Sequence, residues 1–232
     1  MAASTVERVF DAAVVPSRAR GLNPAQLAAV THDGGPLLIV AGAGTGKTRT
    51  LVRRVARLLD DGVDPARILL VTFTRRSAAE MLGRVAALGG EDARRVWGGT
   101  FHAVANRLLR VHAASAGLDP AFSVIDTADA ADVLGMLRAE QGLDRRVRRF
   151  PRKDTALAIW SRLVNSGRPL DDVLTDHFPW CAEHADGLRD LFRAYVERKR
   201  SQRLLDYDDL LLHLRALAAS PDAGVALRAA FD

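Results

Sequence analysis

The residues best suited to chemistry lie in one short segment, AGAGTGKT, at positions 41–48. Its glycines allow a tight turn in which backbone N–H groups converge on an anion. Lys47 can reach the terminal phosphates of a nucleotide, and the Thr48 hydroxyl can coordinate the magnesium ion that bridges phosphate oxygens. The segment therefore predicts a P-loop that binds ATP, or a similar nucleotide, with Mg²⁺. The predicted binding residues of the loop are Ala41, Gly42, Ala43, Gly44, Thr45, Gly46, Lys47 and Thr48.

The sequence around the loop fits the strand–loop–helix context of this motif. The pattern G-x-x-x-x-G-K-[ST] is met except at its first position, where Ala41 replaces glycine. The apolar run at 37–40 predicts a strand that ends at the loop, and apolar residues at helical spacing from Leu51 to Leu59 predict a helix after it. A glycine-rich turn with a chance lysine is the alternative. The strand–loop–helix context disfavours this alternative. A chance lysine is also disfavoured because all but three of the 33 basic residues are arginine.

Further apolar runs predict an α/β fold with a parallel sheet flanked by helices. The runs at 68–73 and 96–100 predict strands, and each is followed by a helical pattern, at 75–88 and 101–114. The run at 122–125 indicates a fourth strand.

Residues 127–203 differ from this alternation because helical patterns dominate, separated by glycine and proline. We interpret this stretch as an inserted, mainly helical subdomain. In its best-defined helix, Leu188, Phe192 and Tyr195 share an apolar face, and we expect the basic side chains, including Lys199, to point elsewhere. A last helix is expected at 206–219.

The composition is that of a globular protein, with 48% hydrophobic and 26% charged residues. No apolar run approaches the ~20 residues that span a bilayer, and residues 1–21 lack the apolar core of a secretory signal. We therefore expect a soluble, cytoplasmic protein with no membrane association. A single cysteine, Cys181, excludes an internal disulfide. The net charge of +5 favours a polyanionic partner such as nucleic acid without requiring one.

Four segments together resemble the N-terminal part of superfamily 1 DNA helicases of the UvrD/PcrA/Rep type. Beside the P-loop these are LNPAQLAAV around Gln26, VTFTRRSAAEML at 71–82, GTFHAVANRLLR at 99–110 and LLDYDDLL at 204–211. They occur in the order and approximate spacing of that family. The resemblance covers nearly the whole chain, with the first twenty residues and parts of the helical stretch matching least.

The resemblance implies roles for individual residues. Gln26 would hydrogen-bond the adenine edge and select ATP, with Arg49 assisting near the base or sugar. Without the family resemblance, a purely structural role for Gln26 on a helix surface is an equal alternative. Single-stranded DNA would lie across two segments, with aromatic rings stacking on bases and polar groups meeting phosphates. These residues are Phe73, Thr74, Arg75, Arg76, Thr100, Phe101 and His102. The family more often has Asn-Lys where Arg75-Arg76 stands, and a purely structural role for His102 remains an alternative.

The basic run Arg145–Lys153, RRVRRFPRK, needs separate consideration. In the helical insertion of such a helicase it could contact duplex DNA ahead of the motor. A solvated helix face is the favoured alternative, because arginine is common throughout this chain.

The resemblance implies a RecA-like P-loop domain with a helical insertion. The expected boundaries are 1–20 for an N-terminal extension, 21–115 for the first part of the RecA-like domain, 116–203 for the insertion and 204–232 for the return to the RecA-like domain. The full-length protein would be an ATP-dependent 3′-to-5′ DNA helicase that acts on single-stranded DNA and single-strand/duplex junctions.

ATP hydrolysis in this family needs an acidic pair at the end of a buried strand, one carboxylate for the magnesium shell and one to activate water. Asp126 is followed by Thr127, and Asp206 begins a helix, so neither fits. We expect an incomplete sheet, with the D-E-x-Q motif beyond Asp232, and no motor activity in this 232-residue form. The alternative is a stand-alone nucleotide- or DNA-binding module, or a degenerate relative. The reading frame after Asp232 distinguishes the two.

Overall fold

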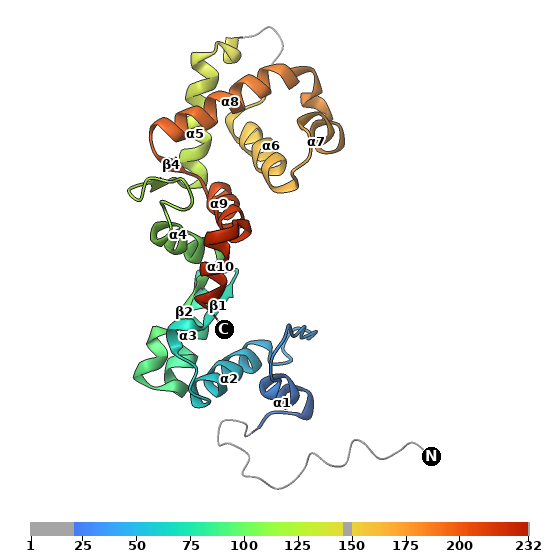
Figure 1. The fold of residues 1–232 in the computed structure, drawn as a ribbon. Helices are drawn as coiled ribbons and strands as arrows, with labels where there is room; N and C mark the ends of the chain where they lie inside the picture. The colour runs from blue at the N-terminus through green and yellow to red at the C-terminus, as the bar shows by residue number, and fades with distance from the viewer. Residues whose placement is uncertain (1–20, 146–149, 232) are drawn as a thin grey trace. The chain divides into compact units, whose positions relative to one another are not determined.

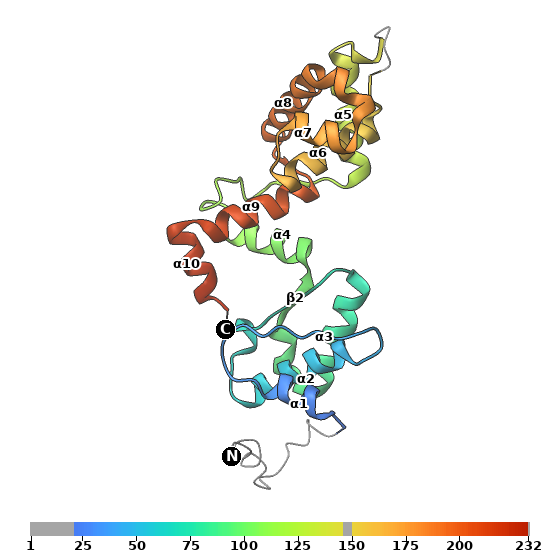
Figure 2. The same ribbon diagram turned by 90° about the vertical axis from the view of Figure 1, so that its right-hand side faces the viewer.

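The computed structural model describes residues 21–145 and 150–231, which divide into two compact units (Figures 1 and 2). The first unit contains residues up to Val104 together with 228–231, and the second contains Ala105–Leu227. Within the described ranges, no single helix is both long and apolar enough to cross a membrane. Helices α9 (Tyr207–Ala219) and α10 (Pro221–Ala229) satisfy that test only as a pair, which is bent by 95°.

The first unit is built from helices packed beside a pair of parallel strands. Its elements are α1 (Pro24–Thr31), α2 (Lys47–Asp60), β1 (Leu69–Thr72), α3 (Arg75–Gly89), β2 (Trp97–Thr100) and the start of α4 (Phe101–Val111). Strand β1 pairs with β2 in a register that runs from Leu69 opposite Trp97 to Thr72 opposite Thr100. Apolar residues from α2, α3 and the strands form its core, namely Val52, Val55, Ile68, Leu70, Met81, Val85, Ala93 and Val96.

The predicted strand at 37–40 is wrong. These residues form no strand, and the side chains of Leu38 and Val40 are 87% and 90% exposed. An apolar run becomes a strand only where a neighbouring strand accepts and donates its backbone hydrogen bonds. Among the described residues, β1 and β2 pair with each other alone, and neither extends a ladder to this segment.

The second unit is mainly helical, as the sequence predicts for its central part. Its elements are the rest of α4, β3 (Ser123–Val124), α5 (Thr127–Glu140), α6 (Lys153–Ser166), α7 (Leu170–His177), α8 (Ala185–Ser201), β4 (Leu204–Leu205), α9 and most of α10. Helices α5 to α8 gather around one core (Figure 2) that includes Leu134, Ile159, Leu188, Leu191 and Tyr195. The strand predicted at 122–125 is present as β3, but it pairs in parallel with β4 and not with β1 or β2.

Lys199 departs from the expectation that basic side chains of α8 point away from the core. It is only 4% exposed, and it follows Leu188, Phe192 and Tyr195 at helical spacing on the same buried face. Its ammonium lies 4.4 Å from the centre of the Tyr195 ring and 5.2 Å from that of Trp160. The charge is accommodated because the carboxylates of Asp206 and Asp209 meet it there.

The basic run Arg145–Lys153 lies only partly within the described ranges, because residues 146–149 fall outside them. At its end, Phe150 is buried against His184, with 5.2 Å between ring centres. Lys153 forms an ion pair with Asp132. Phe150 therefore belongs to the core, and no exposed aromatic ring accompanies the described part of this run.

Candidate functional site

Gln26 is fixed at the start of α1 by a reciprocal cap. Asn23 precedes the helix, and its side chain accepts a hydrogen bond from the Gln26 backbone N–H at 2.8 Å. In return, the side-chain Oε1 of Gln26 accepts from the Asn23 backbone N–H at 3.1 Å. Pro24 occupies the first turn, where its missing N–H costs nothing. This reciprocal cap holds the glutamine side chain in one orientation.

The other end of the same side chain reaches the predicted P-loop. Gln26 Nε2 donates to the carbonyl oxygen of Thr45 at 2.9 Å. Gly46 follows, with φ of 89°, and a Cβ added there would stand 2.8 Å from Gln26 Nε2. Glycine is required at 46 both by the left-handed backbone and by the close approach of the glutamine.

Two arginines of α2 hold α1 in place. Arg54 donates to the carbonyl oxygens of Ala29 and His32, and Arg57 donates to that of Val30. These bonds satisfy carbonyl groups at the C-terminal end of α1, which have no partner within the helix. The position of Gln26 relative to the loop is thereby determined by helix packing as well as by the loop itself.

Lys47 begins α2 and folds back over the loop. Its ammonium donates to the carbonyl oxygens of Gly42 at 2.6 Å and Ala41 at 3.1 Å. The N-cap of α2 is Gly46, which offers no side-chain acceptor, and the first turn contains no acidic residue. The N-terminal N–H groups of α2 and the lysine together provide donors and positive charge for an anion.

A cavity lies between α1 and this loop. Of the predicted nucleotide-binding residues, those that line it are Gln26, Ala41, Gly42, Thr45 and Lys47; Asn23, Ala25, Ala29, Ile39, Val40 and Thr50 complete its described wall. None of these lining residues carries a carboxylate. Thr48 is half-buried in the first turn of α2, and Arg49 lies beside Gly21, so both are near the loop but outside the cavity wall.

The predicted DNA-contacting segments meet at the carboxyl ends of β1 and β2. Phe73 follows β1 and Phe101 follows β2, and their ring centres are 5.5 Å apart at an angle of 44°. Phe73 is 89% exposed and Phe101 is 41% exposed. The parallel register brings them together because Thr72 and Thr100, the residues before them, are paired.

The polar residues of these segments have different roles in the structure. Thr74 caps α3, since its hydroxyl oxygen accepts from the Ser77 N–H, and Thr100 accepts from the Ala103 N–H in α4. Arg75 and Arg76 are exposed in the first turn of α3, where the helix dipole disfavours positive charge. His102 is half-buried in the first turn of α4.

Sequence reasoning missed a buried ionic cluster in the second unit. Lys199 donates to Asp206 at 2.7 Å and to Asp209 at 2.6 Å, and the Tyr195 hydroxyl donates to Asp206 at 2.9 Å. Asp206 and Asp209 also form a reciprocal cap at the start of α9. The spacing of Lys199 four residues after Tyr195, with Asp206 just beyond, is the signal that could have identified it.

The pKa values of the two carboxyl groups respond to opposing influences. Burial raises the pKa of Asp209, and the neighbouring Asp206 charge adds to this, although Lys199 opposes both. Burial acts in the same direction on Asp206, but the Lys199 ammonium and the hydrogen bonds from Lys199, Asp209 and Tyr195 outweigh it, so its pKa lies below the ordinary value. No group of three or more potential metal ligands occurs among the described His, Cys, Asp and Glu residues.

Fold and site together define a helix-rich α/β protein with small parallel sheets and a glycine loop leading into a helix. The chain belongs to the UvrD/REP helicase N-terminal domain family, whose model matches residues 22–232. The family assignment suggested by the four sequence segments is therefore confirmed.

Relatives of known name are similar over most of this chain. The ATP-dependent DNA helicase UvrD1 of Mycobacterium tuberculosis H37Rv is 42% identical over 193 residues, which is 82% of this chain and 25% of the relative. The ATP-dependent DNA helicase PcrA of Leuconostoc citreum is 39% identical over 90% of this chain and 27% of the relative. The ATP-dependent DNA helicase PcrA of Bacillus subtilis 168 is 35% identical over 83% of this chain and 25% of the relative. The chain thus spans about a quarter of the length of these relatives.

Proposed function

We propose that the cavity between α1 and the P-loop binds ATP with Mg²⁺. The observation that carries this proposal is that Gln26 and Lys47 line one cavity and that Gln26 is hydrogen-bonded to the loop through Thr45. Lys47 and the N-terminal N–H groups of α2 would hold the phosphates. On nucleotide binding, the ammonium would exchange its bonds to Ala41 and Gly42 for bonds to phosphate oxygens.

The residues around the loop fit a magnesium-bound triphosphate. Thr48, in the first turn of α2, would present its hydroxyl to Mg²⁺, which neutralises phosphate charge when bound. The absence of carboxylates from the described cavity wall avoids repulsion of the phosphates, but it also leaves no group there to activate water. We therefore propose that the 232-residue chain binds ATP without appreciable turnover.

We further propose that Phe73 and Phe101 form a stacking surface for single-stranded DNA. The two exposed rings lie side by side and so form a small apolar patch, which is a feature of surfaces that bind a ligand. Arg75 and Arg76 lie in the first turn of α3, where the helix dipole disfavours positive charge. A phosphate of the DNA backbone bound at this helix end would offset their charge. His102 is proposed to assist from α4, while Thr74 and Thr100 position the segments as helix caps.

The whole protein is proposed to be an ATP-dependent 3′-to-5′ DNA helicase that acts at junctions of single-stranded and duplex DNA. This proposal rests on the family and on the helicase activity for which the UvrD1 and PcrA relatives are named. In it, residues 21–115 and 204–232 would belong to a RecA-like motor domain, and residues 116–203 would form its helical insertion. One motor domain cannot alternate its grip on DNA, so the chain alone would not unwind it.

Nucleotide binding is tested by titrating a fluorescent ATP analogue into the purified chain with and without Mg²⁺. Lys47→Ala should weaken binding by about tenfold or more, since it removes a charge-assisted hydrogen bond to phosphate. Lys153→Ala is the matched control, because it removes the other exposed lysine, which pairs with Asp132 in the second unit. Equal affinities of the two variants would contradict the site.

DNA binding is tested by fluorescence anisotropy with a labelled oligothymidylate over a salt series. Phe73→Ala should weaken binding by about 1–3 kcal/mol at every salt concentration, whereas Arg75→Ala with Arg76→Ala should also flatten the salt dependence, by about 0.7 in the logarithmic slope for each phosphate that is no longer neutralised. Trp180→Ala removes another exposed aromatic ring, in the second unit, and serves as the control. A Phe73 variant that binds like the Trp180 variant would exclude the aromatic pair.

A further inference from the structure

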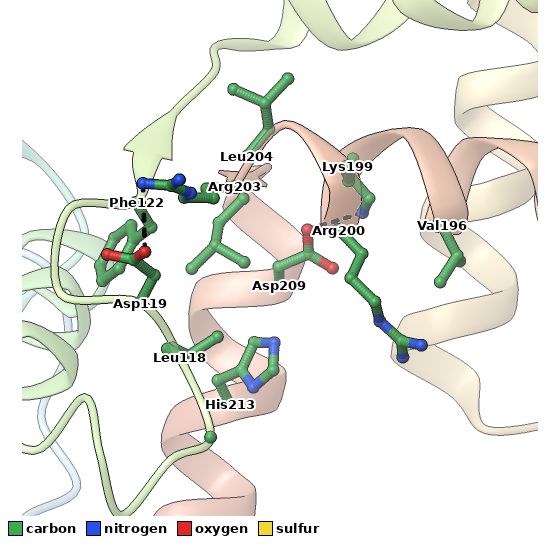
Figure 3. Close-up of a pocket in the computed structure, with 12 residues that line it drawn as sticks. Leu118, Asp119, Phe122, Val196, Lys199, Arg200, Arg203, Leu204, Asp209 and His213 are labelled. Carbon is green, nitrogen blue, oxygen red and sulfur yellow. Dashed lines mark hydrogen bonds and ion pairs between the residues drawn. The ribbon is translucent and has the colours of Figure 1, made fainter.

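A second cavity, of about 260 Å³, lies entirely within the second unit (Figure 3). It is bounded by the loop before β3, the C-terminal end of α8, β4 and the first half of α9. Neither the nucleotide cavity nor the aromatic pair contributes to it, because both belong to the first unit. It therefore needs an explanation of its own.

Part of the cavity wall is apolar. Its apolar lining residues are Leu118, Phe122, Val196, Leu204 and Leu205. Figure 3 places Leu118 and the buried Phe122 on one side of Asp209 and Val196 on the other. Phe122 is held from outside by Arg110, whose guanidinium lies 4.3 Å from the ring centre and donates to the carbonyl oxygen of Phe122 at 3.1 Å. Phe122 is therefore held in place without a ligand.

The two carboxylates on the cavity wall are already paired with cations. Asp209 accepts from Lys199, which it shares with the buried Asp206, and Asp119 pairs with Arg203 at 3.2 Å. Figure 3 shows these two pairs on separate parts of the wall. Because burial also raises the pKa of Asp209, a full second negative charge beside Asp206 is disfavoured.

Arg203 itself adopts a conformation that is rare for a residue with a side chain. Its φ is 55°, which is unique among the non-glycine residues that the structure describes. The backbone is held there because its carbonyl oxygen accepts from the Ser123 N–H at 2.9 Å, which joins β4 to β3. Such conformations persist where surrounding contacts impose them, and they are frequent at ligand sites.

Two donors on the wall remain without a partner. Neither the guanidinium of Arg200 nor the ring of His213 has a hydrogen bond or ion pair with any residue in the described ranges. Both line the cavity, and Figure 3 draws both below Asp209, Arg200 from α8 and His213 from α9. The cavity thus offers an apolar wall beside two donors suited to an anion.

We propose that this cavity holds one nucleotide of a single nucleic-acid strand, with its base against the apolar part of the wall formed by Leu118 and Phe122 and its phosphate bound by Arg200 and His213. The pairing of a flat apolar group with an adjacent anion is the chemistry of a nucleotide unit. This inference rests on the proposed DNA-binding function, but it assigns the contact to different residues in a different unit.

The first test is binding of a labelled oligothymidylate to variants of the full chain. Arg200→Ala and His213→Gln should each weaken binding, the arginine variant by about tenfold because it removes a charge-assisted bond. Arg193→Ala is the matched control, since Arg193 is exposed on the same helix, pairs with Asp190 and does not line the cavity. Thermal unfolding of each variant verifies that the fold is kept. If the Arg200 and Arg193 variants bind equally, the proposal is overturned.

The second test locates the strand. An oligonucleotide carrying 4-thiothymidine is photo-crosslinked to the chain, and the modified peptides are identified by mass spectrometry. Crosslinks at Leu118, Phe122 or His213 support the cavity, whether or not Phe73 and Phe101 are also labelled. Crosslinks at Phe73 and Phe101 alone would support the proposed stacking surface and reject this inference. Crosslinks at the cavity alone would support this inference and reject the stacking surface.

Competition identifies the source of the ligand. We expect unlabelled oligothymidylate to abolish the cavity crosslinks at concentrations where thymidine monophosphate, matched in total nucleotide, leaves most of them. Equal competition by the free nucleotide would overturn binding of a strand. Equal competition by polyglutamate, matched in charge, would overturn nucleotide recognition and indicate an acidic peptide as the ligand.

Discussion

The Nε2 atom of Gln26 donates a hydrogen bond to the main-chain carbonyl oxygen of Thr45, 2.9 Å away. This bond joins the first described helix to the phosphate loop, over nineteen positions of sequence. The same side chain completes the cap of α1 through its oxygen. Gln26 therefore couples the start of α1 to the conformation of the loop before any nucleotide is present.

Gln26→Glu separates these two roles. The carboxylate keeps an oxygen for the Asn23 N–H but loses the donor to Thr45, so the loop should be less well held while α1 keeps its cap. We expect ATP affinity to fall by at least about fivefold, because the loss of one hydrogen bond of about 1 kcal/mol adds to repulsion between the new carboxylate and the phosphates. Asn23→Asp keeps an equivalent cap and also adds a carboxylate to the cavity wall, so it is the control for the charge. An unchanged affinity in the glutamate variant would mean that the Thr45 bond is dispensable.

Gly46→Ala tests the close approach of the loop to Gln26. The new Cβ would stand 2.8 Å from Gln26 Nε2 on a backbone with φ of 89°, so both the loop and the glutamine must move. Gly62 has a similar φ of 86°, but a Cβ added there would have no atom within 4 Å. Gly62→Ala should therefore show only the backbone strain of about 1 kcal/mol. Nucleotide titration and urea unfolding are compared for the two variants. We expect Gly46→Ala to weaken nucleotide binding much more than Gly62→Ala does, with a smaller difference in the free energy of unfolding.

Lys199→Met tests the buried ionic cluster. Removal of the ammonium leaves Asp206 and Asp209 without their shared cation, so the free energy of unfolding should fall by about 3–5 kcal/mol. Urea unfolding followed by tryptophan fluorescence reports this directly, because the Trp160 ring lies 5.2 Å from the ammonium. Lys153→Met, which breaks an exposed pair with Asp132, should leave stability nearly unchanged.

Asp206→Asn tests the charge of this cluster through its pH dependence. Asparagine caps a helix as well as aspartate does, so α9 should keep its start. The pKa of Asp206 is lower in the folded chain than its ordinary value of 3.8, so its charge stabilises the fold above that pH and the benefit disappears as pH falls through the folded pKa. The difference in unfolding free energy between wild type and variant should therefore be full at about pH 6 and shrink below about pH 4. A difference that is constant over this range would rule out the paired carboxylate.

Local signals in the sequence were sufficient for most helices. Helical spacing, capping residues and glycine loops act over a few positions, and α3, α4 and α9 begin at or within a residue of where these signals place them. The motif at 41–48 likewise identifies a loop before a helix. Such features depend little on distant parts of the chain.

Features that depend on distant pairing could not be predicted in the same way. The run at 37–40 has the composition of a strand, but whether it pairs is decided by segments far away in the sequence. The adjacency of Phe73 and Phe101 requires the register of β1 against β2, which the family resemblance implies and which local patterns leave open. The burial of Lys199 depends on Asp206 and Asp209, which lie at the start of the next helix.

The exposed segment that contains Leu38 and Val40 has a practical consequence for work with this chain. Exposed apolar segments outside a sheet can add as strands to another molecule, so we expect the chain to associate at high concentration through Leu38 and Val40. Leu38→Lys should keep the chain monodisperse in light scattering at concentrations where the wild type associates. The stretch leading into the phosphate loop would then be the place to engineer first for solubility.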